Sequence, residues 1–159
     1  MSNNVDIKIN EIKETFFIVR EELFIPDPNK MVKIEMYHRM GVNTEIKRLK
    51  FTLSAYIHYE DSTDKLAEIL VDNYFELPFM HEYQVEDNNL ILPSEKLLII
   101  VRESIAHVRA LFQIRLRGTV YQQVIVPLDD ATNVTKHFFP NLIKNESGVM
   151  SDLIGKVEA

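Results

Sequence analysis

Histidine is the side chain in this sequence best suited to metal binding or to proton transfer near neutral pH. The chain has five of them: His38, His58, His81, His107 and His137. They form neither an HExxH motif nor a His-x-His pair, the spacings that bring two imidazoles to one metal. Glu103 and His107 lie four residues apart, which predicts an ordinary side-chain pair on a helix. We therefore expect no metal site and no cofactor.

Other catalytic patterns are also missing from the sequence. There is no cysteine, which excludes thiol nucleophiles and thiolate zinc sites. The four glycines are scattered and build neither a phosphate-binding loop nor a Gly-x-Ser-x-Gly elbow. Asp129 and Asp130 are neighbouring carboxylates, but capping of a helix explains them better than acid–base catalysis. We expect a protein that is not an enzyme.

Composition limits the class of protein and of partner. With 159 residues, 46% of them hydrophobic, the chain can fold as one domain, with a core over about 5–140 and a C-terminal tail over 141–159. The absence of cysteine, of an export signal and of a long apolar run predicts a cytoplasmic protein without membrane insertion. The net charge of −6 and the dispersed basic residues disfavour nucleic acid as a partner.

Four segments of the first half alternate between apolar and polar residues, the pattern of half-buried β-strands. The first runs from Val5 through Ile9 and continues toward Ile18 after an irregularity. The others cover 32–40, 49–59 and 67–77. Most connections between them are short, and 26–29 (Pro-Asp-Pro-Asn) is a strong turn, so we expect an antiparallel sheet.

Two helices are expected after the strands, which gives an α+β fold. Pro93 and Ser94 suit the start of a long helix that ends at Arg117-Gly118. A short helix should follow an extended stretch over 119–127, begin at 129 or 130 and end before Pro140. We expect a partly anchored loop over 79–92 and a frayed helix over 149–157.

The long helix carries apolar residues on more than one side. A stripe from Leu98 to Phe112 repeats at three and four residues, and further apolar positions lie beside it. Either the helix has a wide core face, or its second side is an interface between copies of the chain. The interface hypothesis assigns that role to Leu97, Ile100, Val108 and Leu111.

One stretch of the sequence resembles the SecB family of export chaperones. Arg102-Glu103-Ser104-Ile105 within the helix, then Arg117-Gly118-Thr119, Gln122 and Pro127, resemble the family's Arg-Glu-Cys-Ile helix, its Arg-Gly-Thr helix end and its proline-containing crossover. Three positions depart from that pattern: Ser104 replaces the cysteine, Val120 an aromatic residue and Tyr121 a proline. The C-terminal tail does not resemble the family's motor-binding tail, which argues against direct docking on the translocation motor.

The resemblance implies a four-stranded antiparallel sheet with two helices packed on one face. It also implies a homotetramer, built as a dimer of dimers with the long helices between the sheets. The function implied is that of an ATP-independent holdase, which binds unfolded or preprotein polypeptides in an apolar groove during protein export.

The same resemblance places the groove along the fourth strand, the crossover and the last helix. Phe75 matches the family's groove aromatic, and the crossover contributes Tyr121, Val124, Val126 and Leu128. Apolar chemistry adds candidates that no motif supports: Phe79, Met80, Tyr83, Phe138 and Phe139. For each of these positions, packing in the core is the competing role.

Three hypotheses about function remain open at this point. The first is a holdase, either general or devoted to one client as in antitoxin-associated chaperones. The second is an interaction or scaffold module that keeps the fold but has one native partner. The third is an enzyme with an unrecognised cleft, which the missing catalytic motifs disfavour.

Overall fold

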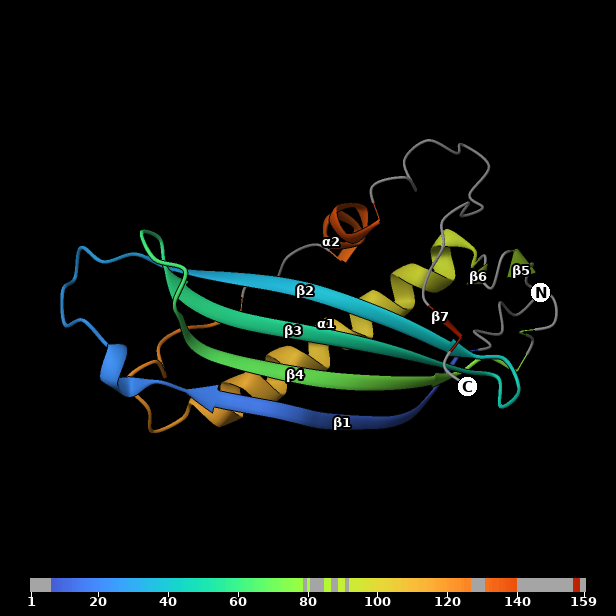
Figure 1. Cartoon of the computed structure of the whole chain (residues 1–159), viewed down its shortest axis with the longest axis horizontal. Coiled ribbons are helices and arrows are strands. Elements are labelled where there is room, and N and C mark those ends of the chain that lie inside the picture. The colour runs from blue at the N-terminus through green and yellow to red at the C-terminus, as the bar shows by residue number, and fades with distance from the viewer. Residues whose placement is uncertain are drawn as a thin grey trace.

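The computed structural model describes residues 7–78, 80, 85–86, 89–90, 92–126, 131–139 and 156–157. It confirms the α+β fold, with a four-stranded antiparallel sheet and two helices (Figure 1). The long strands are β1 (Lys8–Val19), β2 (Val32–Asn43), β3 (Arg48–Tyr59) and β4 (Lys65–Glu76), and the helices are α1 (Ser94–Leu116) and α2 (Ala131–Phe138). No helix of this described part is long and apolar enough to cross a membrane.

The order of strands in the main sheet is β1-β4-β3-β2-β7, which leaves β1 at one edge. The strands β2, β3 and β4 form an antiparallel meander, and β1 pairs with β4 on its far side. The irregularity expected in the first strand is present as two register shifts, after Ile9 and after Glu14. β2 lies at the opposite side of the meander and pairs with β7 (Lys156–Val157) at Gly41 and Val42 alone.

Helix α1 runs across one face of the sheet and closes the core (Figure 1). The inward row of β3, from Leu49 to Tyr59, is fully or almost fully buried, as its alternation predicts. Phe112 of α1 and Phe75 of β4 are among the largest side chains without exposed surface. The core also holds polar groups: the Asn73 side chain donates to the Phe51 carbonyl and accepts from His107, and Ser104 of α1 is fully buried.

The opposite face of the sheet is polar and has its own network of hydrogen bonds. The Asp72 carboxylate accepts from Thr52 at 2.6 Å, and the Glu68 carboxylate accepts from Tyr37 at 2.7 Å and from Lys65 at 2.6 Å. Both carboxylates are buried although no helix covers them, because their polar neighbours shield them. This face therefore lacks the apolar surface of the other.

Helix α2 docks beside β2 through a cluster of aromatic rings around His38. The imidazole of His38 stacks on Phe51 of β3 and lies 4.4 Å from the ring of Phe138 and 4.7 Å from that of Phe139. Burial among these rings and, after it, the electrostatic influence of the nearby His137 lower the pKa of His38. The neutral imidazole is thus the form that holds α2 on the sheet.

Three local predictions are corrected by the structure. Residues Lys156–Val157 form strand β7 instead of the end of a helix, since Gly155 weakens helix continuation and the edge of β2 offers backbone partners. The expected loop contains a short hairpin of β5 (Val85–Glu86) and β6 (Asn89–Leu90). The expected extended crossover starts instead with turns over 117–123, where Gly118 has a φ of +78°.

The Glu103–His107 pairing expected on the helix is also replaced. Nδ1 of His107 lies 2.7 Å from the Asn73 side-chain oxygen in the sheet, and Glu103 accepts from Arg102 instead. The pKa of His107 is lowered by burial. His107 therefore contacts the core through Asn73, and Glu103 pairs with Arg102 on the surface of the helix.

Burial of α1 predicts different outcomes for two substitutions on the same helix. Val108→Asp should lower the free energy of unfolding by at least about 3 kcal/mol, because Val108 is fully buried and the carboxylate would have no partner there. Ile114→Asp, at a position 56% exposed, should cost less than about 1 kcal/mol. Urea denaturation followed by circular dichroism measures both; equal losses would contradict this packing.

The environment of His38 predicts that stability depends on pH. The pKa of His38 is lowered in the folded chain, so the unfolded chain binds the proton more readily. The contribution of the neutral His38 to the free energy of unfolding is therefore present above about pH 6.5 and is lost as the pH falls below it. His38→Phe keeps the ring packing and should reduce the drop in urea midpoint between pH 7.5 and 5.5. An unchanged drop in this variant would assign the effect to other groups, such as His107.

Candidate functional site

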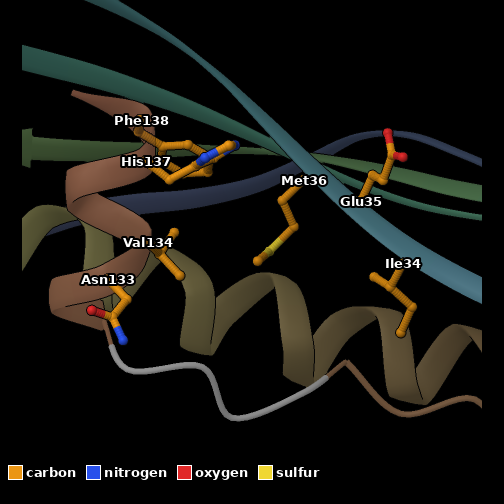
Figure 2. A pocket seen from close by; sticks show the side chains of 7 residues that line it. All are labelled: Ile34, Glu35, Met36, Asn133, Val134, His137 and Phe138. Carbon is orange, nitrogen blue, oxygen red and sulfur yellow. The ribbon is translucent and has the colours of Figure 1, made fainter. Parts of the chain in front are cut away.

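A hollow lies between β2 and α2, and we call it the β2 groove. Its volume is about 620 Å³, and its lining residues are Ile34, Glu35, Met36, Asn133, Val134, His137 and Phe138. Figure 2 shows Ile34 and Met36 pointing from β2 toward the helices, while Glu35 points away. The floor of the groove is thus apolar, and its α2 wall carries both apolar and polar side chains.

The alternation of β2 explains why one of its faces lines the groove. Val32, Ile34, Met36 and His38 are half-buried, while the residues between them are exposed. An inner-facing residue of a central strand would be covered from both sides, as Leu53 and Ile57 of β3 are. Among the described residues, β2 has a strand neighbour on its β3 side only along this stretch, so its inner face keeps accessible apolar surface.

The wall formed by α2 follows from its amphipathic sequence. Val134 and Phe138 are four residues apart and lie on one side of the helix, and Val134 is almost completely buried. Asn133 and His137 are exposed at the rim of the groove. An extended chain in the groove would therefore meet apolar surface inside and hydrogen-bonding groups at the edge.

Glu35 is held on the polar face of the sheet. Its carboxylate accepts hydrogen bonds from the hydroxyl of Tyr56 and, at 3.1 Å, from Nε2 of His58. Both hydrogen bonds lower the pKa of Glu35, and the one from Tyr56 has the larger effect. The hydrogen bond between Tyr56 and Glu35 also raises the pKa of Tyr56 to about 12. The acidic group is thereby turned away from the apolar floor.

A second hollow, which we call the crossover pocket, lies at the end of β2 where the chain turns from α1 toward α2. Its volume is about 290 Å³. The lining residues are Phe24, Ile25, Pro26, Asp27, Pro28, Lys30, Val32, Tyr59, Val120, Tyr121, Gln123 and Val124. Val32 of this pocket and Ile34 of the β2 groove are successive residues on one face of β2, about 7 Å apart along the strand. The two hollows therefore follow one another along the same strand.

Tyr121 fixes the crossover to the segment after β1. Its hydroxyl donates to the Arg20 carbonyl at 2.7 Å, and its ring packs edge-on against Phe24 with 5.9 Å between ring centres. Burial raises the pKa of Tyr121 to about 12, so the hydroxyl remains a donor near neutral pH. The 3-10 helix η1 (Glu21–Leu23) adds a second tie, since Glu21 accepts from the Val120 N–H at 3.0 Å.

Exposed apolar side chains surround the crossover pocket. They are Phe24, Ile25, Met31, Val120 and Ile125, each more than 40% exposed. Contiguous apolar patches on protein surfaces often mark sites where another apolar surface binds.

The candidate peptide-binding residues are distributed over the core and the two hollows. Tyr121 and Val124 line the crossover pocket, and Phe138 lines the β2 groove. Phe75, Met80, Val126 and Phe139 are buried in the core. Phe79, Tyr83 and Leu128 lie outside the described residues.

The candidate interface residues lie mostly inside the protein. Leu97, Ile100 and Val108 have no exposed surface in the single chain, because they are part of its hydrophobic core. Leu111 is half-buried against the same core. Ile114, a further apolar residue of α1, is the one that is clearly exposed among these described positions.

Sequence reasoning missed the residues that line most of the β2 groove and the crossover pocket. Ile34 and Met36 were placed on one face of a strand, but the position of that strand at the side of the sheet is needed to recognise them as accessible. Phe24 and Ile25 are adjacent apolar residues directly before the Pro-Asp-Pro-Asn turn. This pair was the sequence feature that could have indicated apolar surface at the crossover pocket. Among the described residues, no group of three or more His, Asp and Glu side chains could hold a metal ion.

Comparison with known proteins gives information about the fold. No family model and no curated protein matches the sequence. Among solved structures, the SecB-like chaperone Rv1957 of Mycobacterium tuberculosis, in complex with a ChAD peptide from the HigA1 antitoxin, superposes with a TM-score of 0.52. The match covers 79% of this chain and 91% of the chaperone at 11% identity. The chain therefore has a SecB-like fold.

Proposed function

We propose that this protein is a chaperone of the holdase type, which binds non-native polypeptide along the β2 groove and the crossover pocket without ATP. The observation that carries the proposal is the pair of successive apolar hollows along one accessible strand. An unfolded client exposes apolar side chains, and their burial contributes about 25 cal/mol per Å² without a requirement for one sequence. Met36 and the aromatic side chains of the lining can adapt to different clients.

The structural comparison supports a polypeptide as the ligand. A chaperone of the same fold was solved with a peptide from an antitoxin. That complex also makes a dedicated client a second candidate for this protein, in place of a broad set of export clients. A scaffold module with one native partner would differ from both by its failure to bind unfolded chains. We place the protein in the cytoplasm, where export clients and antitoxins would both be met.

Assembly of several copies is part of the proposal, and β1 together with α1 is the region that fits it. β1 is a twelve-residue strand at the edge of the sheet, and its Ile9, Ile12 and Phe16 are each more than 40% exposed. An edge strand with apolar side chains pairs readily with another strand. A dimer of dimers would bury this edge and the exposed side of α1 around Ile114.

The first prediction concerns the groove itself. Met36→Glu should weaken binding of a reduced, slowly refolding client by at least about tenfold, because a carboxylate replaces apolar surface in the groove. Ile46→Glu introduces the same group at a position 57% exposed outside both hollows and serves as the matched control. Suppression of client aggregation and the mass of the complex, without nucleotide, measure the effect. Equal loss or equal retention in the two variants would reject the groove.

The second prediction concerns assembly. Ile12→Lys should lower the mass of the oligomer in sedimentation, since it places a charge on the exposed edge of β1 while the single chain keeps its core. Ile46→Lys should leave the mass unchanged. A monomeric wild-type protein, or an oligomer that Ile12→Lys does not affect, would exclude this interface.

A further inference from the structure

A third hollow lies on the polar face of the sheet, beside the turn from β2 to β3, and we call it the basic hollow. Its volume is about 190 Å³, and its lining includes Gly41, Asn43, Ile46, Arg48, Lys50 and Tyr74. Lys50 pairs with Asp72 on the polar face, and Tyr74 lies directly opposite Lys50 in the sheet. Cross-strand neighbours share one face. The basic hollow and the β2 groove are therefore on opposite faces of the sheet.

Gly41 explains why the polar face is hollow at this point. It lies opposite Lys50 in the register of β2 on β3, and it places no side chain between those of Arg39 and Asn43. A glycine inside a strand marks a bulge, a bend, or a place where another group approaches the backbone closely. The register shows no bulge here, and pairing with β7 takes place at the edge of β2, where a side chain does not interfere. Gly41 thus leaves room for a group on the face of the sheet.

The guanidinium of Arg48 has a donor that its neighbours do not satisfy. Nη2 donates to the side-chain oxygen of Asn10 at 2.8 Å, in the amide orientation that also lets Asn10 donate to Glu76 at 3.0 Å. Nε is buried and has no acceptor among the described residues. A buried donor without a partner costs free energy, and a guanidinium binds an oxyanion with two parallel hydrogen bonds. A turn of this half-buried side chain toward an oxyanion in the hollow would give Nε its acceptor.

The ammonium of Lys50 is the second cation of the hollow, and its existing ion pair is loose. It lies 3.4 Å from Oδ2 of Asp72, whereas Lys65 lies 2.6 Å from Glu68 on the same face. Asp72 also accepts from Thr52 at 2.6 Å, so its charge is shared between two donors. An ammonium has three N–H groups. Lys50 therefore keeps donors for a second anion while it remains beside Asp72.

The charge around the basic hollow is positive, although the whole chain carries a net charge of −6. All four long strands place charged side chains on this part of the polar face. The basic ones are Lys8, Lys13, Arg39, Arg48 and Lys50, and the acidic ones are Glu11, Asp72 and Glu76. In the adjoining turn, the charges of Glu45 and Lys47 balance. The local potential therefore attracts an anion.

Size and charge favour a single carboxylate as the ligand. Pockets that hold whole small-molecule ligands usually measure about 300–1,000 Å³, so a hollow of about 190 Å³ suits one functional group. A phosphate dianion would meet stronger repulsion from Asp72 and Glu76 than a carboxylate with one charge. A nucleic acid would bring the charges of its other phosphates against an acidic chain. A carboxylate matches the planar fork of Arg48 and the local excess of positive charge.

Ile46 gives the rim of the basic hollow an apolar contact. Its side chain is 57% exposed in the turn. The turn is fixed, because Oδ1 of Asn43 accepts from the N–H groups of Glu45 at 3.1 Å and of Ile46 at 3.2 Å. An exposed apolar side chain beside a charged hollow fits a protein segment in which an apolar residue neighbours an acidic one.

From these contacts we propose that the basic hollow is a docking site for an acidic side chain, aspartate or glutamate, of a partner protein. Arg48 and Lys50 bind its carboxylate, and Ile46 contacts an apolar residue next to it in the partner. The site lies on the opposite face of the sheet from the β2 groove. A partner can therefore dock here while the groove is occupied, and the inference does not depend on the proposed function.

Two pentapeptides with blocked ends test the proposal: glycine–leucine–glutamate–leucine–glycine, and the same peptide with glutamine in place of glutamate. Binding is followed at low salt through the backbone amide signals of the isotope-labelled protein. The glutamate peptide should shift the signals of Gly41, Lys50 and Tyr74 and bind at least about fivefold more tightly than the glutamine peptide. Equal affinities of the two peptides would overturn the proposal, because the carboxylate would then contribute nothing.

Substitutions that remove one charge locate the site. Arg48→Gln and Lys50→Gln should each remove most of the difference between the two peptides, and Arg48→Lys, which keeps the charge but loses the fork, should retain part of it. Lys33→Gln is the matched control, because Lys33 pairs with Glu60 at the far end of the same face. Circular dichroism confirms that each variant is folded. A difference that persists in both glutamine variants of the hollow, or that disappears in Lys33→Gln as well, would overturn the assignment.

Further titrations separate this site from other ligands and from the β2 groove. Inorganic phosphate and a single-stranded oligonucleotide serve as competitors of the glutamate peptide, and tighter binding of either at the same residues would overturn the choice of a protein carboxylate. Met36→Glu alters the groove on the other face and should leave binding of the glutamate peptide unchanged. A protein that binds this peptide but no unfolded client would lose the proposed function and keep the docking site.

Discussion

The packing of α1 on the inner face of β3 and β4 is the constraint on which the rest of the structure depends. The row from Leu49 to Tyr59 is buried by this contact, and Phe112 and Phe75 lie within it. One long helix covers the middle strands of a four-stranded sheet but cannot also cover the strands at both edges of that face. The apolar inner face of β2 therefore extends beyond the helix, and α2 stands across the resulting groove.

The two faces of the sheet are stabilised in different ways. On the polar face, Asp72 and Glu68 are satisfied by neighbouring hydroxyl and ammonium groups, so this surface is stable without a covering layer. On the inner face, the aromatic cluster at His38 holds α2 at one end of the groove, and Tyr121 holds the crossover at the other. The hollows thus lie between two fixed supports, which limits the entropy lost on binding.

The SecB-like fold is shared with Rv1957 although only 11% of the residues are identical. Apolar lining residues can be exchanged for others of similar size. A binding surface of the proposed kind would therefore tolerate sequence divergence. A catalytic site would require specific residues to persist.

The sequence by itself determined the four long strands and the two helices of this protein. Period-two alternation located all four long strands, and the repeat of apolar residues located α1, because both patterns record burial within one element. Only the tertiary structure decided which apolar residues are accessible. Leu97, Ile100 and Val108 were candidates for an interface but are buried in the single chain, whereas Ile34 and Met36, predicted on one face of a strand, line a groove. Accessibility depends on the order of strands and on the reach of α1, which are set by contacts distant in sequence.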